Sequence, residues 1–310
     1  MLAVVIYGKI IIDDIGLPDG SVVRGLLGGG GPQAAFGARL WTESVGLLSR
    51  AGEDLEDRHR QALASLDIDL LGVAYYADIH TLRAGRPRNG RHLTRLRPTH
   101  SPATASENWT RLLSRPLDLP AAYQRPQAIH LITEYADEPM VTTAVALREQ
   151  GALLSLEPLI DIDRWTNGPE IMALLPQVDV VTPDWPSAIG LAGTDEPRRV
   201  LEYWSGLGPR LVAVRHAERG SYICSRDDGR SWHIPAVPVD VHDPTGAGNS
   251  YGGGLCAGWL QTNNAAWAGT MAAVSASFML EHTGMPLSPE TYQATARRRL
   301  HASLSRAISL

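Results

Sequence analysis

The chain has 310 residues, a length that supports one large domain or a domain with a small attachment, and 44% of them are hydrophobic and 20% charged, as is typical of globular protein. Its formal net charge of −5 argues against a protein that binds nucleic acid through a general excess of positive charge. No apolar run is long enough for a transmembrane helix, and the first residues lack the basic start and cleavage site of a signal peptide, so we expect a cytoplasmic protein that binds neither nucleic acid nor membrane.

The N-terminal part of the chain alternates short apolar segments with turn signals. A Pro-Asp-Gly turn at 18–20 separates two of these segments, and four glycines at 28–31 precede a helix whose first turn would contain Pro32. In chain order we expect strands over Leu2–Tyr7, Ile10–Ile15, Ser21–Arg24 and Thr42–Leu48, and helices from about Pro32 and over Leu55–Leu66.

The segment from Asp78 to Pro98 is rich in arginine and carries an Asn-Gly pair at 89–90 between two strand-like arms. This pattern is typical of a β-hairpin, so we predict a two-stranded excursion from the main body. Its arginines indicate either an anionic or heavily hydroxylated ligand or a solvated hairpin face; the ones concerned are Arg83, Arg86, Arg91 and Arg95.

From residue 128 onward, strand-like and helix-like segments alternate, which indicates parallel strands joined by crossover helices in a single α/β domain over 1–310. The expected strands are Ala128–Thr133, Leu153–Leu156, Val178–Val181 and Leu211–Val214, and the helices are Pro139–Gln150, Glu170–Leu175, Pro186–Leu191 and Pro197–Gly206. A β-hairpin over Tyr222–Cys224 and Ser231–Ile234 follows, and then helices near Tyr251–Gln261, near Ala265–Glu281 and from Pro289.

The stretch from His242 to Gly254 reads HDPTGAGNSYGGG and lies between a β segment and an apolar helix. Glycines in such a turn let backbone N–H groups face an anion, phosphate above all, at the start of a helix. The other interpretation is close packing of the helix against its neighbours. The turn alone leaves both open.

The order of these features resembles the ribokinase, or phosphofructokinase-B-type, family of carbohydrate and nucleoside kinases over most of the chain. The specific motif is DPTGAG at Asp243–Gly248. Weaker parallels support it: GKIIID at Gly8–Asp13, the diglycine Gly28-Gly29, RAGED at Arg50–Asp54 and RHAERGS at Arg215–Ser221.

The resemblance implies a three-layer, parallel-sheet α/β fold with a small β lid, formed by segments of about 10–24 and 77–98. It implies transfer of the γ-phosphoryl group of ATP, with Mg²⁺, to a hydroxyl of a sugar, nucleoside or polyol, and a homodimer through the lid. We assign no residue as a metal ligand. The implied anion hole is Gly246, Ala247 and Gly248, closed by the N–H of Asn249; the implied substrate residues are Asp13, Gly28, Gly29 and Gln33; and the implied nucleotide residues are Asp184, Ser187, His216 and Gly220.

The chain departs from the family pattern at three functional positions. Asn249 stands where the family has its catalytic aspartate, and an amide cannot hold a proton near neutral pH. Ser187 ends TPDWPS where the family has the glutamate of N-x-x-E, and Pro32 stands about where it has a substrate-binding asparagine. The segments IIDDI, GGGG, GARL and DPTGAGN are similar to a divergent branch of the maintenance-of-killer type, in which Asn249 would be native.

The missing base leaves several interpretations open. Asp243 is the first candidate for a substitute carboxylate, although it could instead fix the loop; Asp14 and Glu157 are the others. Phosphoryl transfer depends mainly on positioning and charge stabilisation, so the chain can be a working kinase. It can also be a non-catalytic nucleotide- or sugar-binding member, or an enzyme that performs different chemistry in the same pocket.

Overall fold

The computed structural model describes residues 2–17, 19–86, 111–136, 138–160 and 167–310. The second arm of the hairpin predicted around residues 89–90 lies outside these residues.

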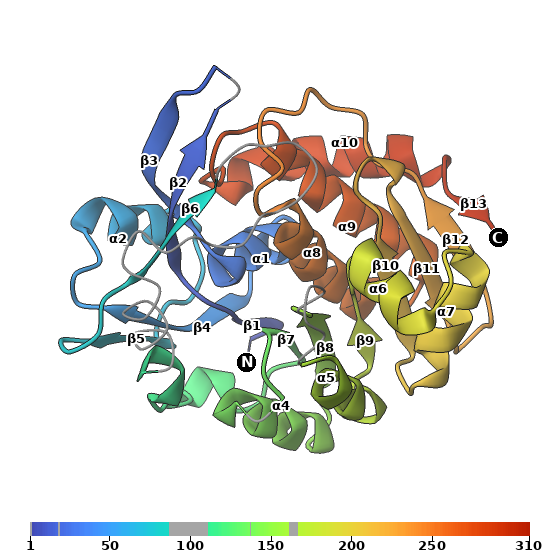
Figure 1. The fold of residues 1–310 in the computed structure, drawn as a ribbon, viewed down its shortest axis with the longest axis horizontal. Coiled ribbons are helices and arrows are strands. Elements are labelled where there is room, and N and C mark those ends of the chain that lie inside the picture. Colours follow the sequence, from blue (N-terminus) through green and yellow to red (C-terminus); the bar gives the residue numbers. More distant parts are fainter. Residues whose placement is uncertain (1, 18, 87–110, 137, 161–166) are drawn as a thin grey trace.

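Most strands of the described chain belong to one large sheet (Figure 1). They are β1 Val4–Tyr7, β4 Val45–Gly52, β5 Val73–Tyr76, β7 Ala128–Thr133, β8 Leu153–Pro158, β9 Val180–Val181, β10 Leu211–Arg215, β11 Ser221–Ser225, β12 Ser231–Ile234 and β13 Ile308–Ser309. Their order across the sheet is β13-β12-β11-β10-β9-β8-β7-β1-β4-β5. Neighbours from β10 to β5 are parallel, and the pairs from β10 to β13 are antiparallel.

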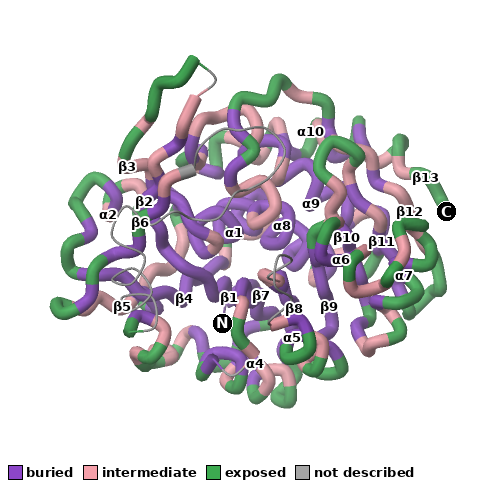
Figure 2. Tube along the Cα trace, viewed as in Figure 1, coloured by how far each residue is buried: buried purple, intermediate pink, exposed green. Residues whose placement is uncertain are grey.

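Helices cover both faces of this sheet, which is why its central strands β1, β4 and β7 are buried at every position and are mostly apolar. The helices are α1 Gly30–Arg39, α2 Asp57–Ala64, α4 Pro139–Glu149, α5 Gly168–Leu174, α6 Trp185–Ala192, α7 Pro197–Gly206, α8 Ala247–Thr262, α9 Ala265–Leu280 and α10 Gln293–Leu304. One buried core lies between the sheet and α1, α8 and α9; a second lies between the sheet and α4, α5, α6 and α7. Figure 2 shows the strands and α8 and α9 as the buried centre of the molecule. No helix of the described chain is both long and apolar enough to cross a membrane.

A small three-stranded sheet stands away from the large one (Figure 1). Its strands are β2 Ile11–Gly16, β3 Val22–Gly28 and β6 Leu82–Arg86. β2 pairs antiparallel with β3 and parallel with β6, so β6, the first arm of the predicted hairpin, completes the sheet that β2 and β3 begin. We call this sheet the lid.

The predicted elements that fall on the described residues are present, apart from their bounds. Two short edge strands, β5 and β13, were not predicted. The predicted start of the glycine-rich helix, near Tyr251, was too late, because α8 begins at Ala247. Glycine has low helix propensity, so a segment that holds several is not recognised as helix; tertiary contacts override that preference here.

Strand β1 is the point at which the chain reverses its direction across the sheet. It lies between β4, which follows it in the chain, and β7, which begins the second half. In parallel α/β sheets, ligands bind outside the carboxyl ends of the strands at such a point. Lys9, the only lysine of the sequence, lies just beyond β1 and forms an ion pair with Glu134, just beyond β7. Burial holds the pKa of Lys9 below its ordinary value although Glu134 opposes the shift.

Candidate active site

The first turn of α8 presents unpaired backbone donors. Gly246 precedes the helix with φ +82°, a left-handed conformation that favours glycine, and so turns the chain sharply into the helix. The N–H of Ala247 donates to the carbonyl of Pro244 at 3.3 Å. Within the described part of the chain, the N–H groups of Gly248 and Asn249 have no acceptor. Two such donors at a helix N-terminus are what a phosphate oxygen requires.

The N-terminal ends of α1 and α8 meet at this turn. The side-chain amide of Asn249 donates to Oε1 of Gln33, which belongs to the first turn of α1, at 2.6 Å. Gln33 is buried, and its amide carbon lies 2.3 Å from where a Cβ atom on Gly246 would stand. Gln33 therefore contacts both ends of the motif, and only glycine fits at position 246.

Asp13 reaches the same place from the lid. Its side chain is 1% exposed, and one of its carboxylate oxygens lies 2.2 Å from where a Cβ atom on Gly28 would stand. The amide nitrogen of Gln33 is 3.5 Å from that same point. The predicted substrate residues Asp13, Gly28 and Gln33 are thus brought together, and Gln33 connects them to Asn249.

Asp243 is held by two backbone groups and does not extend into the site as an unpaired carboxylate. Its Oδ1 accepts from the N–H of Thr245 at 3.0 Å and its Oδ2 from the N–H of Gly284 at 3.3 Å. The residue is 5% exposed. This geometry favours the loop-fixing interpretation of Asp243 over the role of substitute base.

A buried charged network that the sequence analysis did not assemble lies against α8. Arg215, at the carboxyl end of β10, donates from Nη1 to Oε1 of Glu157 at 2.6 Å. The other oxygen of Glu157 lies 3.7 Å from Nε2 of His130, whose Nδ1 is 2.8 Å from the hydroxyl of Ser155. Burial would raise the pKa of Glu157, but Arg215 and His130 outweigh it and hold the pKa below its ordinary value.

Two glycines allow α8 to lie on this network. A Cβ atom at Gly248 would stand 2.4 Å from Nη1 of Arg215, and one at Gly252 would stand 2.7 Å from Oε2 of Glu157. In the sequence, Arg215 was noted only as the first residue of RHAERGS and Glu157 only as a candidate substitute carboxylate, and His130 was not predicted at all. A histidine in the middle of a buried strand gives no sequence signal of its own.

The predicted nucleotide residues lie at the carboxyl ends of β9 and β10. Asp184 caps α6 by accepting from the N–H of Ser187 at 3.0 Å, and it forms a β-bridge with Arg215. The ring of His216 stacks on Trp185, with centroids 4.1 Å apart and planes 6° apart. Burial, and then the charge of Arg219, lower the pKa of His216.

Gly220 is explained by the conformation and the close packing of the backbone. It ends the short turn after β10 with φ +88°, and a Cβ atom there would stand 2.1 Å from the carbonyl oxygen of Ile234. The conformation and the close approach both explain a glycine at this position.

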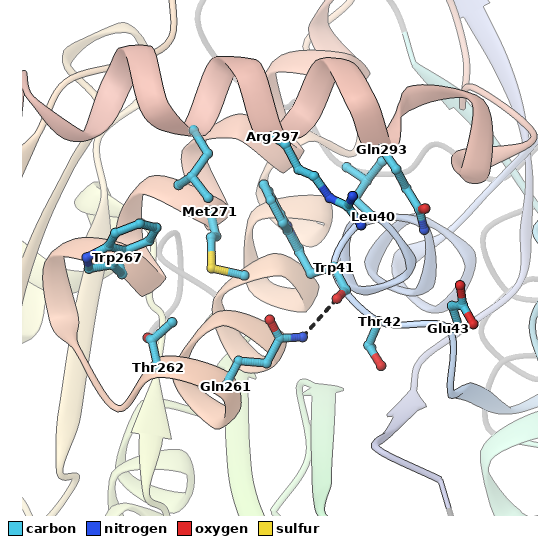
Figure 3. A pocket seen from close by; sticks show the side chains of 11 residues that line it. Leu40, Trp41, Thr42, Glu43, Gln261, Thr262, Trp267, Met271, Gln293 and Arg297 are labelled. Carbon is cyan, nitrogen blue, oxygen red and sulfur yellow. Dashed lines mark hydrogen bonds between the residues drawn. The ribbon is translucent and has the colours of Figure 1, made fainter.

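Two hollows of the described surface lie away from these residues. One, of about 520 Å³, is formed at the opposite end of α8 by α9, α10 and the segment after α1; Gln261 donates there to the carbonyl of Trp41 at 2.8 Å (Figure 3). The other, of about 320 Å³, is lined by Asp14, Arg24, Gly25, Arg58 and Arg83 beside the lid. Neither contains the residues that converge at the start of α8.

Comparisons with known proteins find kinases that are similar to this chain in sequence or in fold. The chain is 24% identical over 263 residues to a cytidine kinase of Thermococcus kodakarensis, which covers 84% of this chain and 89% of that protein. It superposes on a nucleoside kinase of Methanocaldococcus jannaschii with a TM-score of 0.71 at 19% identity, covering 97% of this chain and 99% of the other. It superposes on the aminoimidazole riboside kinase of Salmonella enterica, in complex with aminoimidazole riboside and an ATP analogue, with a TM-score of 0.68 at 17% identity, covering 96% and 99%.

The large sheet with its helical layers, the three-stranded lid and the glycine-rich start of α8 together form the ribokinase-like fold. The sequence profile of the pfkB family of carbohydrate kinases matches residues 1–291, nearly the whole chain. The chain therefore belongs to the pfkB family of carbohydrate kinases.

Proposed function

We propose that this protein transfers the γ-phosphoryl group of ATP to a hydroxyl of a small polyhydroxylated substrate, a sugar or a nucleoside. The observation that carries the proposal is the junction at Gln33. It contacts Asn249 at the start of α8 by a 2.6 Å hydrogen bond, and it lies beside Asp13 at the base of the lid. A phosphate site and a hydroxyl-binding carboxylate are thus neighbours, as transfer between two bound molecules requires.

The residues have separate roles in this proposal. Asp13 accepts hydrogen bonds from substrate hydroxyls, and these bonds are strong because the acceptor is charged. The unpaired N–H groups of Gly248 and Asn249 stabilise the negative charge on the phosphoryl oxygens. Asp184, Ser187, His216 and Gly220 lie at the strand ends beside them, where the nucleotide would extend.

Transfer forms a bond between the substrate oxygen and the γ-phosphorus and breaks the bond from that phosphorus to the β–γ bridging oxygen, so ADP leaves. The substrate proton passes to water, because Asn249 cannot hold it. Loss of a general base costs typically ~10²–10⁴-fold, so the proposed enzyme is slow but active.

The donor set fits the phosphates of ATP better than it fits a protein-bound metal. The N–H groups at α8 are phosphate donors, whereas the carboxylates nearby are engaged: Asp184 caps α6 and Glu157 pairs with Arg215. Mg²⁺ would therefore enter on ATP, where it neutralises charge on the β and γ oxygens.

A competing function is nucleotide or sugar binding without turnover. It is favoured by Asn249 and Ser187, which stand where the family resemblance implies acidic residues. The test is ATP consumption with Mg²⁺ on a panel of sugars and nucleosides, together with calorimetric titration of ATP and ADP. Turnover on any panel member supports the kinase, and binding without turnover supports the competing function. Absence of nucleotide binding contradicts the kinase, and absence of binding to the panel members as well contradicts both.

A further inference from the structure

The start of α8 carries a positive charge that its glycine motif does not supply. Nη1 of Arg215 stands 2.4 Å from the position that a Cβ atom on Gly248 would occupy, so the guanidinium lies directly against the backbone of the first turn. The N–H of Gly248 is one of the two donors in that turn without an acceptor among the described residues. A guanidinium and a helix N-terminus at one point both favour an anion.

The position of Arg215 is fixed by its ion pair with Glu157. Its bond to Oε1 of Glu157 is short, 2.6 Å, and the two side chains are 14% and 2% exposed. His130 stands behind Glu157 and is fully buried. A guanidinium held by a buried carboxylate is pre-organised, so little side-chain entropy is lost when it makes a further hydrogen bond.

Arg215 also has donors left. A guanidinium has five N–H groups in a planar fork. The bond to Glu157 uses Nη1; Nε is buried and has no acceptor within the described residues, and Nη2 likewise makes no hydrogen bond to them. Nη2 is not among the fully buried atoms of the described residues that lack a partner, so it is the donor that an incoming ligand can reach, and an anionic acceptor there would form a charge-assisted hydrogen bond.

We propose that Arg215 is a catalytic residue of this protein that contacts the transferred γ-phosphoryl group of ATP and stabilises its negative charge. The inference rests on the proposed kinase function and adds to it the source of charge stabilisation. It also explains how phosphoryl transfer can proceed with an amide at position 249. Since the transition state is loose, a fixed positive charge on the phosphoryl oxygens contributes more than a base does.

Glu157 and His130 act through Arg215. Glu157 keeps the guanidinium in place, and His130 keeps Glu157 in place. Both are positioning residues.

The test compares Arg215→Gln and Arg215→Lys with the parent. We expect Arg215→Gln to lower the rate of phosphoryl transfer by about 100-fold and to weaken binding of ATP by about tenfold, while binding of ADP, which lacks the γ-phosphate, stays within twofold. Arg215→Lys keeps a positive charge but loses the planar fork of N–H donors, so its transfer rate and its affinity for ATP should lie between those of the parent and those of Arg215→Gln.

A loss of stability could imitate this result, because Arg215→Gln leaves Glu157 buried without its partner. The double variant Arg215→Gln/Glu157→Gln removes both charges and keeps a hydrogen-bonding pair of similar size. It should fold as the parent does and still bind ATP more weakly than the parent, with its affinity for ADP unchanged. The matched control is Arg148→Gln, which breaks a partly buried ion pair with Asp179 at the end of α4. This variant should change the affinity for neither ATP nor ADP.

The outcomes separate the two proposals. A parent protein that binds ATP, with an Arg215→Gln variant that binds and transfers equally well, would overturn the role of Arg215 and leave the kinase standing. If the folded double variant loses affinity for ATP and ADP equally, the role of Arg215 would also be overturned, because the contact would then not be to the γ-phosphoryl group. A parent protein that binds no nucleotide would contradict the proposed function itself.

Discussion

At the scale of single residues, the site differs from the family pattern at one position and matches it at another. Asn249 is an amide where a catalytic carboxylate is expected, whereas Asp13 is the carboxylate expected to bind the substrate. Asn249 donates its side-chain N–H to Gln33, which leaves its carbonyl oxygen to accept from a substrate hydroxyl. Asp13 is buried at the base of the lid. Each of these residues can be tested by a nearly isosteric change.

Replacing Asn249 with aspartate should preserve or raise the rate of phosphoryl transfer and introduce a pH dependence that the parent lacks. Aspartate can hold the proton of the hydroxyl, and Gln33 can turn its amide to donate where it now accepts. Single-turnover transfer measured from pH 3.5 to 9 tests this: the rate of the variant should fall as the pH drops through the pKa of the new carboxyl group, ordinarily about 3.9. Asn264→Asp, at the cap of α9, is the matched control and should change nothing. If Asn249→Asp abolishes an activity that the parent shows, the amide has a role that no base can fill.

Replacing Asp13 with asparagine should raise the KM for the alcohol substrate at least tenfold and leave the affinity for ADP unchanged, because a neutral amide accepts weaker hydrogen bonds than a carboxylate. Steady-state kinetics and calorimetry measure the two effects. Asp14→Asn is the matched control, since Asp14 bonds instead to Arg24 and to the N–H of Gly25. A parallel loss of both ligands would indicate a folding defect.

At the scale of the elements, the position of α8 depends on glycines inside the helix. Gly252 lies on the network of Glu157 and His130, and Gly253 lies on the backbone of α1, where a Cβ atom would stand 1.9 Å from the carbonyl oxygen of Ala34. The glycine-rich stretch therefore serves close helix packing as well as an exposed helix start. The two interpretations of the sequence are compatible.

Gly253→Ala should destabilise the protein and weaken ADP binding together. The added methyl group forces α1 and α8 apart, at a cost of about 1–3 kcal/mol, and moves the donors of Gly248 and Asn249. Urea unfolding and calorimetry measure both effects. Gly206→Ala, at the end of α7, meets nothing within 4 Å and should be neutral or slightly stabilising. Unchanged stability in Gly253→Ala would show that the two helices can shift without cost.

How far the sequence could predict these features depends on how far apart in the chain the interacting residues lie. The parallel strands and the turn before α8 carry local signals, and the resemblance linked Asp13, Gly28 and Gln33 before their contact was visible. The network of Arg215, Glu157 and His130 joins three strands that are far apart in the chain, and no local pattern marks it. Asp243 was a candidate base in the sequence because one of its two backbone partners, the N–H of Gly284, lies 41 residues later in the chain and gives no local signal.

At the scale of the whole molecule, the site lies between the lid, α1, α8 and the carboxyl ends of the central strands (Figure 1). A ligand there contacts several parts of the fold at once. Binding to the native state alone should therefore be visible as global stabilisation.

ADP at about 100 times its dissociation constant should raise the free energy of unfolding by about 2.7 kcal/mol, because the unfolded chain has no such site. Thermal unfolding with and without millimolar ADP and Mg²⁺ measures the shift. Gly248→Val should lose it, since the side chain would collide with Arg215 and crowd the phosphate. A well-folded parent protein with no shift would count directly against a phosphate site at α8.

The burial of Lys9 makes the crevice observable by a simple chemical label. Because the sequence has no other lysine, an amine-acylating reagent can modify a side chain at position 9 alone, and there only when the carboxyl ends of β1 and β7 separate enough to release Lys9 from Glu134. The rate at which the Lys9 side chain is acylated, distinguished from the α-amino group by fragmenting the peptide that carries it, would thus report the opening of the site. We expect bound ADP and substrate to slow it, and denaturation to accelerate it to the rate of an ordinary exposed lysine.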